Sequence, residues 1–309
     1  MFSIIMPVYN SERYVKEAIE SVLNQNFNDF ELIVIDDGSK DKSLDIINTL
    51  ANHDSRIKVL INQEQKGVSF SRNRGLRYCS NSYVLFLDSD DLLPHYALKT
   101  YYTVIKKTNA DIVFSKLSTN MNKIRAEVQP KIHIQLFNQY KAIKYYLNFR
   151  KLSGYAGAKV YRKEILSNTF FMENVNYGED GIFNYAALQN AQIIAYIDLD
   201  TYIYRVRNGS LTGRNSGYGI KNLNSFKQID FISKRTPKIL KKYVNVFRFE
   251  IYNSEIQIYE ESGKDSKIKF SKEFKKMKKY CDSYWLYTFL VSINPRIKLH
   301  ALKYFVGRN

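Results

Sequence analysis

Three carboxylates follow an apolar run in the segment Tyr83–Asp91, whose sequence is YVLFLDSDD. The run has the composition of a buried parallel strand, and ligands of open α/β sheets bind beyond the carboxyl ends of the strands. Asp88 and Asp90 suit Mg²⁺ or Mn²⁺, because these ions take oxygen ligands and bridge readily to diphosphates. Clustered like charges are costly, so we favour a metal or nucleotide site over the alternative that Asp91 caps a helix beginning near Pro94.

A second acidic turn, with the sequence DDGS at 36–39, follows another apolar strand. Gly38 allows a tight turn there, and Ser39 or Asp41 would cap the next helix. Alone, this segment is an ordinary strand-turn-helix. Beside the PVYN sequence at 7–10, it offers a carboxylate for the imide N–H of a base, an aromatic face for a pyrimidine and polar groups for a ribose.

Two further segments carry charged residues at the start of a helix. Arg72, in the sequence GVSFSRN at 67–73, could bind a diphosphate through its planar fork, although a surface ion pair is an equal alternative. The pair Glu179-Asp180 lies at a loop-to-helix junction. Direct displacement at a sugar needs a base opposite the leaving group, but from the residues alone a capping role for Asp180 is favoured.

The elements that must position these residues alternate along the first part of the chain. Apolar runs predict strands near 2–8, 31–36, 57–61 and 83–88, and helical spacing predicts helices near 12–25, 41–52 and 68–79. Such a succession indicates a parallel sheet covered on both faces, with the polar residues that follow the strands gathered in one crevice. These are Asn10, Asp36, Asp37, Gly67, Asp88 and Asp90.

The pattern is weaker further along the chain. We expect a helix at 95–107, a strand at 111–115, an irregular segment at 118–135, helices at 138–149 and 181–190, strands near 193–197 and 200–206, and mainly helices beyond 221.

In this order and at these intervals, MPVYN, VIDDGS, SRNRG, YVLFLDSDD and GEDGIF resemble the motifs of family 2 glycosyltransferases over about residues 1–210. The resemblance implies an α/β fold of the GT-A type, Rossmann-like, with a mainly parallel sheet flanked by helices and a mainly helical basic C-terminal extension. It implies a catalytic domain at 1–220, with a nucleotide-sugar half at 1–117 and an acceptor half at 118–220. Residues 221–309 would form the helical basic region.

The resemblance also implies an inverting transfer that depends on Mn²⁺ or Mg²⁺. Asp37 and Tyr9 would hold the base, Asp88 the ribose and Asp90 the metal, and Asp180, with Glu179 beside it, would be the general base. Arg205 and Arg207 would stabilise the departing diphosphate. The complete predicted nucleotide-sugar-binding set is Pro7, Tyr9, Asn10, Glu12, Asp37, Arg72, Asp88, Ser89, Arg205 and Arg207.

One departure from the family bears on the type of enzyme. The Gln-x-x-Arg-Trp motif of processive synthases is missing, since the sole tryptophan, Trp285, lacks those neighbours. We therefore expect a non-processive enzyme that adds one sugar at a time. The implied donor is a UDP-sugar, and the implied acceptor is a lipid-linked glycan in the synthesis of bacterial capsular polysaccharide, exopolysaccharide or lipopolysaccharide.

The net charge of +17 lies mainly at the C-terminal end, where residues 221–309 hold 20 Lys and Arg against 8 Asp and Glu. Within 267–284, lysines surround an apolar stripe formed by Phe270, Phe274, Met277, Cys281 and Tyr284, which predicts an amphipathic basic helix. We favour contact of this stripe with an anionic membrane surface over the alternative that it covers the catalytic domain while the lysines are solvated.

Localisation follows from features that are missing. The N-terminus runs directly into a strand without a secretory leader, and the apolar segment 285–293 is shorter than the roughly 20 residues that a spanning helix needs. Cys79 and Cys281 have no metal-ligand spacing and fit a reducing compartment. We expect a cytoplasmic protein, peripheral on the inner face of the cytoplasmic membrane if the basic helix binds lipid.

Three other functions are less favoured. A nucleic-acid-binding protein would explain the charge, but the positive excess lies outside the acidic crevice and no recognisable module is present. A sugar nucleotidyltransferase would carry a Gly-rich phosphate loop after the first strand, where the sequence has PVYN instead. A catalytically silent sugar-binding relative differs only in forming no product.

Overall fold

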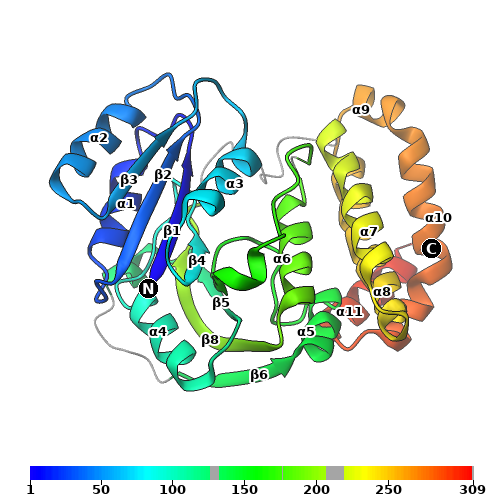
Figure 1. Cartoon of the computed structure of the whole chain (residues 1–309). Coiled ribbons are helices and arrows are strands. Elements are labelled where there is room, and N and C mark those ends of the chain that lie inside the picture. The colour runs from blue at the N-terminus through cyan, green and yellow to red at the C-terminus, as the bar shows by residue number, and fades with distance from the viewer. Residues whose placement is uncertain (126–131, 176, 207–218, 308–309) are drawn as a thin grey trace. The chain divides into compact units, whose positions relative to one another are not determined.

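The computed structural model describes residues 1–125, 132–175, 177–206 and 219–307. Its described strands form one sheet in the order β3-β2-β1-β4-β7-β5-β8-β6 (Figure 1). The strands are β1 (Phe2–Val8), β2 (Phe30–Asp36), β3 (Ile57–Ile61), β4 (Tyr83–Phe86), β5 (Ile112–Ser118), β6 (Ile134–Asn138), β7 (Lys159–Arg162) and β8 (Ile193–Ile203).

The first four strands confirm the predicted parallel arrangement. Strand β1 pairs in parallel with both β2 and β4, and β2 pairs in parallel with β3. The connecting helices are α1 (Val15–Leu23), α2 (Ser43–His53) and α3 (Val68–Tyr78). Because Val8, Asp36 and Ile61 are in register, the turns after β1, β2 and β3 begin at the same edge of the sheet.

The second half of the sheet differs from the prediction. Strand β7 runs antiparallel to its neighbours β4 and β5, and β6 runs antiparallel to β8, so the sheet is mixed. The supposedly irregular segment 118–135 contains the short helix η1 (Met121–Arg125) and the start of β6. The two strands expected near 193–197 and 200–206 form the single strand β8, whose register against β5 shifts on either side of Lys116.

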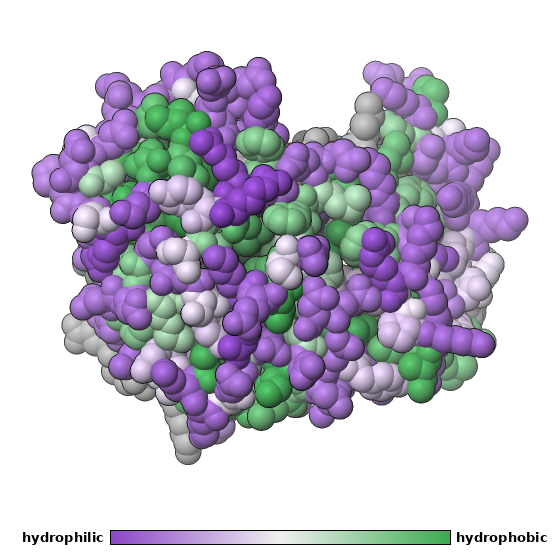
Figure 2. Space-filling model, in the orientation of Figure 1, coloured by the Kyte–Doolittle hydropathy of each residue, from purple (hydrophilic) through white to green (hydrophobic). Residues whose placement is uncertain are grey.

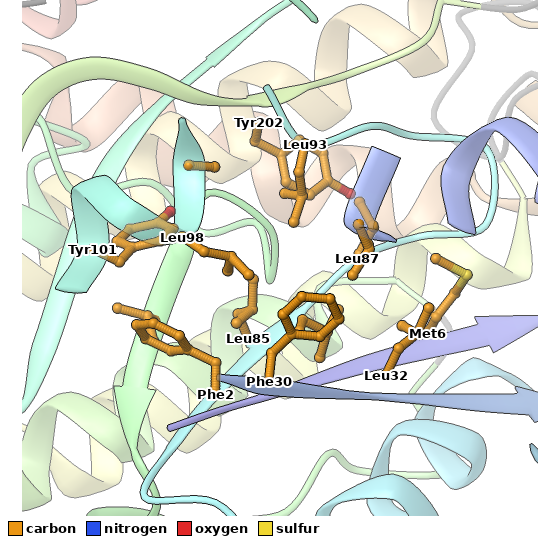
Figure 3. Close-up of a cluster of buried hydrophobic side chains, with 14 of the residues drawn as sticks. Phe2, Met6, Phe30, Leu32, Leu85, Leu87, Leu93, Leu98, Tyr101 and Tyr202 are labelled. Atoms are coloured by element: carbon orange, nitrogen blue, oxygen red, sulfur yellow. The ribbon is translucent and has the colours of Figure 1, made fainter. Parts of the chain in front are cut away.

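A continuous apolar cluster fills the space between this sheet and its helices. Side chains of β1, β2 and β4 meet residues of α1 and of α4 (Ala97–Thr108), and Figure 3 shows Phe2, Leu85 and Leu98 within this cluster. The ring of Tyr202, near the end of β8, also belongs to it and lies beside Leu93. The cluster therefore extends to the carboxyl edge of the sheet.

Helix α3 packs unusually closely on the sheet at Gly75. A Cβ atom at this position would lie 2.5 Å from Cγ2 of Ile5 in β1 and 3.1 Å from Cδ1 of Ile35 in β2. Glycine therefore allows the backbone of α3 to approach the sheet where any side chain would collide.

By their internal contacts, the residues divide into two compact units that alternate along the chain. The sheet unit comprises 1–139, 155–174 and 186–206, and the helical unit comprises 140–154, 175–185 and 207–309. The predicted domains at 1–220 and 221–309 are consecutive instead, and they stay a prediction. Helices of the second unit include most of α5 (Gln139–Leu147), α7 (Asn224–Arg235), α8 (Lys241–Glu260), α9 (Lys264–Lys269), α10 (Ser271–Val291) and α11 (Pro295–Val306). Helix α6 (Glu179–Asn190) begins in the helical unit and ends in the sheet unit.

Aromatic packing holds the helical unit together. The ring of Phe247 in α8 stacks on Phe149 with the centroids 5.0 Å apart, and Phe274 stacks on Tyr259 at 4.3 Å. Met277 and Cys281 of α10 are fully buried, and α10 packs against α8.

The stripe predicted to face a membrane is thus largely covered within its own unit, because Phe270, Met277 and Cys281 are all buried. The membrane interpretation of that stripe was therefore wrong, because α8 of the same unit packs against α10. Among the described residues, no helix combines the length and apolar character needed to span a bilayer. Figure 2 shows a mainly hydrophilic surface interrupted by small hydrophobic areas.

Candidate functional site

The turns after β1 and β2 are joined by side chains that bond to backbone N–H groups. Asn10, in the left-handed region at φ 49, accepts the Lys40 N–H at 2.8 Å, and Glu12 accepts the Lys42 N–H at 3.0 Å. Tyr9 directly precedes Asn10 and is 39% exposed. Asn10 and Glu12 were predicted to bind nucleotide. In the structure their side chains bond the turn that carries Tyr9 to the turn after β2.

Asp37 joins the turn after β2 to the loop before α3. Its side chain is buried and accepts hydrogen bonds from Asn62 Nδ2 at 2.7 Å, the Lys66 N–H at 2.9 Å and the Gly67 N–H at 2.7 Å. Gly67 has a φ of 92°, which glycine adopts without strain. Within the part of the chain that the structure describes, all three groups that donate to Asp37 are thus uncharged.

Arg72, in the first half of α3, contacts the turn formed by Asp88–Asp91, called the acidic turn below. Its Nη2 donates to Asp88 at 2.8 Å, and its guanidinium lies 5.1 Å from the ring centroid of Phe171. The Arg72 side chain is only 4% exposed, whereas that of Asp88 is 43% exposed. Of the two alternatives for Arg72, the structure shows the ion pair, with the arginine buried and its partner facing solvent, and diphosphate binding by Arg72 stays a prediction.

The third acid of the turn, Asp91, does not cap a helix. Helix α4 begins at Ala97, and Asp91 is buried, accepting the Tyr202 hydroxyl at 2.7 Å and the Arg205 N–H at 2.8 Å. Burial, followed by the negative charge of Asp88, raises the pKa of the Asp91 carboxyl to about 7. The second predicted partner in this turn, Ser89, is also buried, and its hydroxyl lies 2.7 Å from that of Ser11.

Arg205 lies at the same turn. Its Nε donates to the Asp90 carbonyl at 2.9 Å and its Nη2 to Glu17 at 2.5 Å, with the guanidinium 5.3 Å from the ring of Tyr14. Its predicted contact with a departing diphosphate stays a prediction. Arg207 lies outside the described residues.

The acidic turn can share, but not complete, a metal coordination shell. Within the part of the chain that the structure describes, no three His, Cys, Asp or Glu side chains form a group that could hold a metal ion. Asp88 and Asp90 are both partly exposed at the edge of the sheet. One or two carboxylates with open positions suit Mg²⁺ or Mn²⁺, which keep waters and complete their coordination with substrate phosphates. The donor set therefore fits a metal that arrives with a nucleotide.

The two acids predicted to provide the general base belong to the helical unit. Glu179 and Asp180 form the first turn of α6 and are partly exposed. The next residue, Gly181, accepts the buried Tyr146 hydroxyl at 2.8 Å, which fixes the start of the helix to α5. The sheet unit thus brings together the predicted residues from Pro7 to Asp90 and Arg205, while the catalytic role of Asp180 stays a prediction.

Three residues of this site were missed. Asn62 follows β3 directly, so the polar-after-strand signal used elsewhere would have found it. Asn73 exchanges hydrogen bonds of 2.9 and 2.8 Å with the backbone of Phe171 and so holds the ring that packs on Arg72. Tyr202 lies near the end of β8, where nothing in the sequence marks its hydroxyl.

The mixed sheet, the acidic turns at its carboxyl edge and the flanking helices define a GT-A glycosyltransferase fold. The family described as Glycosyl transferase family 2 matches residues 3–170, and the chain belongs to that family.

A curated relative and two solved structures illustrate the likeness. The uncharacterized glycosyltransferase EpsJ of Bacillus subtilis (strain 168) is 30% identical over 221 residues, which cover 69% of this chain and 63% of EpsJ. Residues 1–349 of S. aureus TarS, in complex with UDP-GlcNAc, superpose with a TM-score of 0.66 at 22% identity, covering 97% of this chain and 83% of that one. The mannosyltransferase PcManGT from Pyrobaculum calidifontis, with GDP-Man and Mn²⁺, gives a TM-score of 0.57 at 12% identity, covering 100% of this chain and 88% of that one.

The chain spans less than two thirds of the length of EpsJ. At these identities the two solved structures show the fold, including the helical C-terminal region, which confirms the predicted fold class.

Proposed function

We propose that this protein transfers a sugar from a UDP-sugar to a glycan acceptor, with inversion, in a metal-dependent and non-processive reaction. One observation carries the proposal: in a chain of this family, Asp37 and the Asp88–Asp91 turn lie at the carboxyl edge of one sheet, with Asp37 bonded to the loop before α3 and Asp88 to Arg72 of that helix. The likeness to TarS, which is named a poly(ribitol-phosphate) beta-N-acetylglucosaminyltransferase and is seen with UDP-GlcNAc, supports a UDP-sugar donor.

In this proposal the sheet unit binds the nucleotide. The ring of Tyr9 stacks on the base, Asp37 orders the loop that surrounds it, and Asp88 meets the ribose. Asp90, with Asp88 nearby, would hold Mn²⁺ or Mg²⁺, and that ion would supply positive charge against the diphosphate. The likeness to a mannosyltransferase seen with Mn²⁺ is consistent with this part of the proposal.

The acceptor side depends on the start of α6. Asp180 would remove the proton of the acceptor hydroxyl while the anomeric carbon is attacked, so that a single displacement inverts the configuration and needs no covalent intermediate. Glu179 would lie beside it. The missing Gln-x-x-Arg-Trp motif supports one sugar per encounter, and we propose that the acceptor is a lipid-linked glycan of bacterial surface polysaccharide synthesis.

Calorimetry with UDP-, GDP- and dTDP-sugars, each with and without Mn²⁺, tests the donor. We expect UDP-sugars to bind, more tightly with Mn²⁺. Asp90→Asn should remove the gain from Mn²⁺, and Asp180→Asn should abolish turnover while leaving nucleotide affinity unchanged. Asp198→Asn, which alters an exposed acid paired with Lys116, is the matched control and should behave as wild type. Binding of DNA without binding of any nucleotide sugar would instead support the nucleic-acid alternative, and nucleotide-sugar binding without product would indicate a silent relative.

We also propose that the helical unit contacts the inner face of the cytoplasmic membrane through a surface other than the stripe first predicted. Leu286 and Leu290 of α10 and Leu299 and Leu302 of α11 are between 42% and 65% exposed. Lysines and an arginine accompany them on the same helices, at positions 272, 275, 276, 278, 279, 296, 298 and 303. Exposed leucines among cations suit an anionic lipid surface.

Flotation with vesicles of phosphatidylcholine, with and without phosphatidylglycerol, tests this contact. We expect the protein to float only with the anionic vesicles and Leu290→Glu to lose that property. Ile61→Glu alters an equally apolar, 49% exposed residue of the sheet unit and should float as wild type. Failure of the wild-type protein to float with either vesicle contradicts the contact.

A further inference from the structure

The end of β8 is bonded to the acidic turn Asp88–Asp91 and to Leu92, the residue that follows it. Leu92 and Ile203 form an antiparallel bridge, with the Leu92 N–H donating to Ile203 at 3.0 Å and the Ile203 N–H donating to Leu92 at 2.8 Å. One residue on each side of this bridge, the side chains of Asp91 and Tyr202 also meet. The turn is therefore anchored at its C-terminal end by backbone and by side chain together.

The hydroxyl of Tyr202 connects the two ends of the turn. It donates to Asp91 Oδ2 at 2.7 Å and accepts the Asp88 N–H at 3.2 Å. The hydroxyl oxygen of Tyr202 thus bonds to the backbone of Asp88 and to the side chain of Asp91, the residues on either side of Ser89 and Asp90.

The surroundings leave Tyr202 no alternative position. Its ring is buried in the apolar cluster beside Leu93 (Figure 3), and Gly157 lies against its edge. A Cβ atom at Gly157 would be 2.6 Å from Cε2 of that ring. A buried ring held on two sides gives its hydroxyl a fixed place.

Asp91 is shielded from any ligand in this arrangement. It is 1% exposed and its second oxygen accepts the Arg205 N–H at 2.8 Å. Of the three clustered acids, only Asp88 and Asp90 face the edge of the sheet, and Asp91 bonds to the protein itself.

We infer that Tyr202 and Asp91 form a buried positioning pair that fixes the Asp88–Asp90 turn in the shape required to bind a metal-bound nucleoside diphosphate. This inference rests on the proposed function, because it assigns the two residues a part in metal-dependent nucleotide binding. Groups that orient metal ligands affect metal affinity by about 10- to 100-fold when they are removed.

The test is Tyr202→Phe, which removes one oxygen atom and keeps the buried ring. UDP affinity is measured by calorimetry with and without Mn²⁺. We expect at least a tenfold loss of affinity in the presence of Mn²⁺ and little change in its absence, because the ring and the base-binding turns are unaltered.

Tyr101→Phe is the matched control. Tyr101 is also a buried tyrosine of the same unit, and its hydroxyl bonds to Ser115 at 2.9 Å and to Thr201 of β8 at 2.6 Å, away from the acidic turn. If both hydroxyls served only the stability of the fold, the two variants would show the same gain in UDP affinity from Mn²⁺. We expect Tyr101→Phe to lower the melting temperature and to retain the wild-type gain in UDP affinity from Mn²⁺.

Asp91→Asn provides a second variant that keeps the size of the side chain and an oxygen acceptor for the Arg205 N–H. It should also weaken Mn²⁺-dependent binding, so the inference can be tested even if Tyr202→Phe does not fold. An unchanged Mn²⁺ effect in a folded Tyr202→Phe or Asp91→Asn protein, or an equal loss in Tyr101→Phe, overturns the inference alone. If the wild-type protein gains no UDP affinity from Mn²⁺, the proposed function fails and this inference fails with it.

Discussion

The two edges of the sheet balance their acidic side chains in different ways. Before β3, at the amino edge, Asp54 pairs with Arg56 at 2.6 Å. At the carboxyl edge, Asp37 and Asp91 accept hydrogen bonds from backbone N–H groups and uncharged side chains. An arginine cancels the charge of its partner, and at the carboxyl edge Asp88 is paired in this way with Arg72, whereas Asp37 and Asp91 accept from uncharged donors.

Asp37→Asn should have the largest effect on stability. The variant places an amide where a buried carboxylate accepts three hydrogen bonds, so at least one of the donors from Asn62, Lys66 and Gly67 loses its partner. We expect the free energy of unfolding to fall by about 3 kcal/mol, since each orphaned buried group costs about 1–3 kcal/mol. Urea denaturation measures it, and a loss no greater than that of Asp54→Asn would remove the distinction between the edges.

Arg72→Met separates stability from function at the carboxyl edge. Methionine fills the space beside Phe171, and Asp88 is 43% exposed and can be hydrated, so we expect a loss of only about 1–2 kcal/mol in unfolding free energy. The uncompensated Asp88 would repel a diphosphate, and UDP affinity should fall about tenfold, which equals about 1.4 kcal/mol.

Calorimetry on this variant compares binding directly. Arg77→Met, on the exposed side of the same helix, is the control and should bind UDP as wild type. Unchanged UDP affinity in Arg72→Met would mean that Asp88 and Arg72 act only in folding.

Asp54→Asn should have the smallest effect. The hydrogen bond from Arg56 lowers the pKa of Asp54, so the stabilisation is present above a pH of about 4 and is lost as the pH falls through that lowered pKa. The pair is partly exposed, and we expect a loss of less than about 1 kcal/mol at neutral pH. Denaturation of both proteins from pH 7 to pH 2 should show the two stabilities converging at the acid end; a difference that persists there would contradict the pairing.

The same contrast explains how far the sequence predicts this structure. Strands β1, β2 and β3 were predicted to within one residue, because each is rich in apolar strand-forming residues and is followed by polar residues. The acids at their carboxyl ends were found for the same reason. Local pattern suffices where a strand and the turn that follows it are adjacent in the chain.

Contacts between distant segments escaped prediction. Tyr202 meets Asp91 across 111 residues, and no pattern near either residue indicates the pair. Strand β6 is short and half-exposed, and it is defined by its pairing with β8 rather than by its own sequence. The period of 267–284 predicted an amphipathic helix, but it could not tell whether lipid or α8 would cover Met277 and Cys281.

The closeness of α3 to β1 at Gly75 has a consequence for the charge that this helix carries. Gly75 comes three residues after Arg72, so both lie on the face of α3 that is turned toward the sheet. A methyl group at Gly75 would collide with Ile5 and displace the helix outward, and the guanidinium would withdraw with it from Asp88. The absence of a side chain at Gly75 thus determines how far Arg72 extends toward Asp88. A drug or mutation that moves α3 away from the sheet would weaken the proposed phosphate recognition without contacting a phosphate.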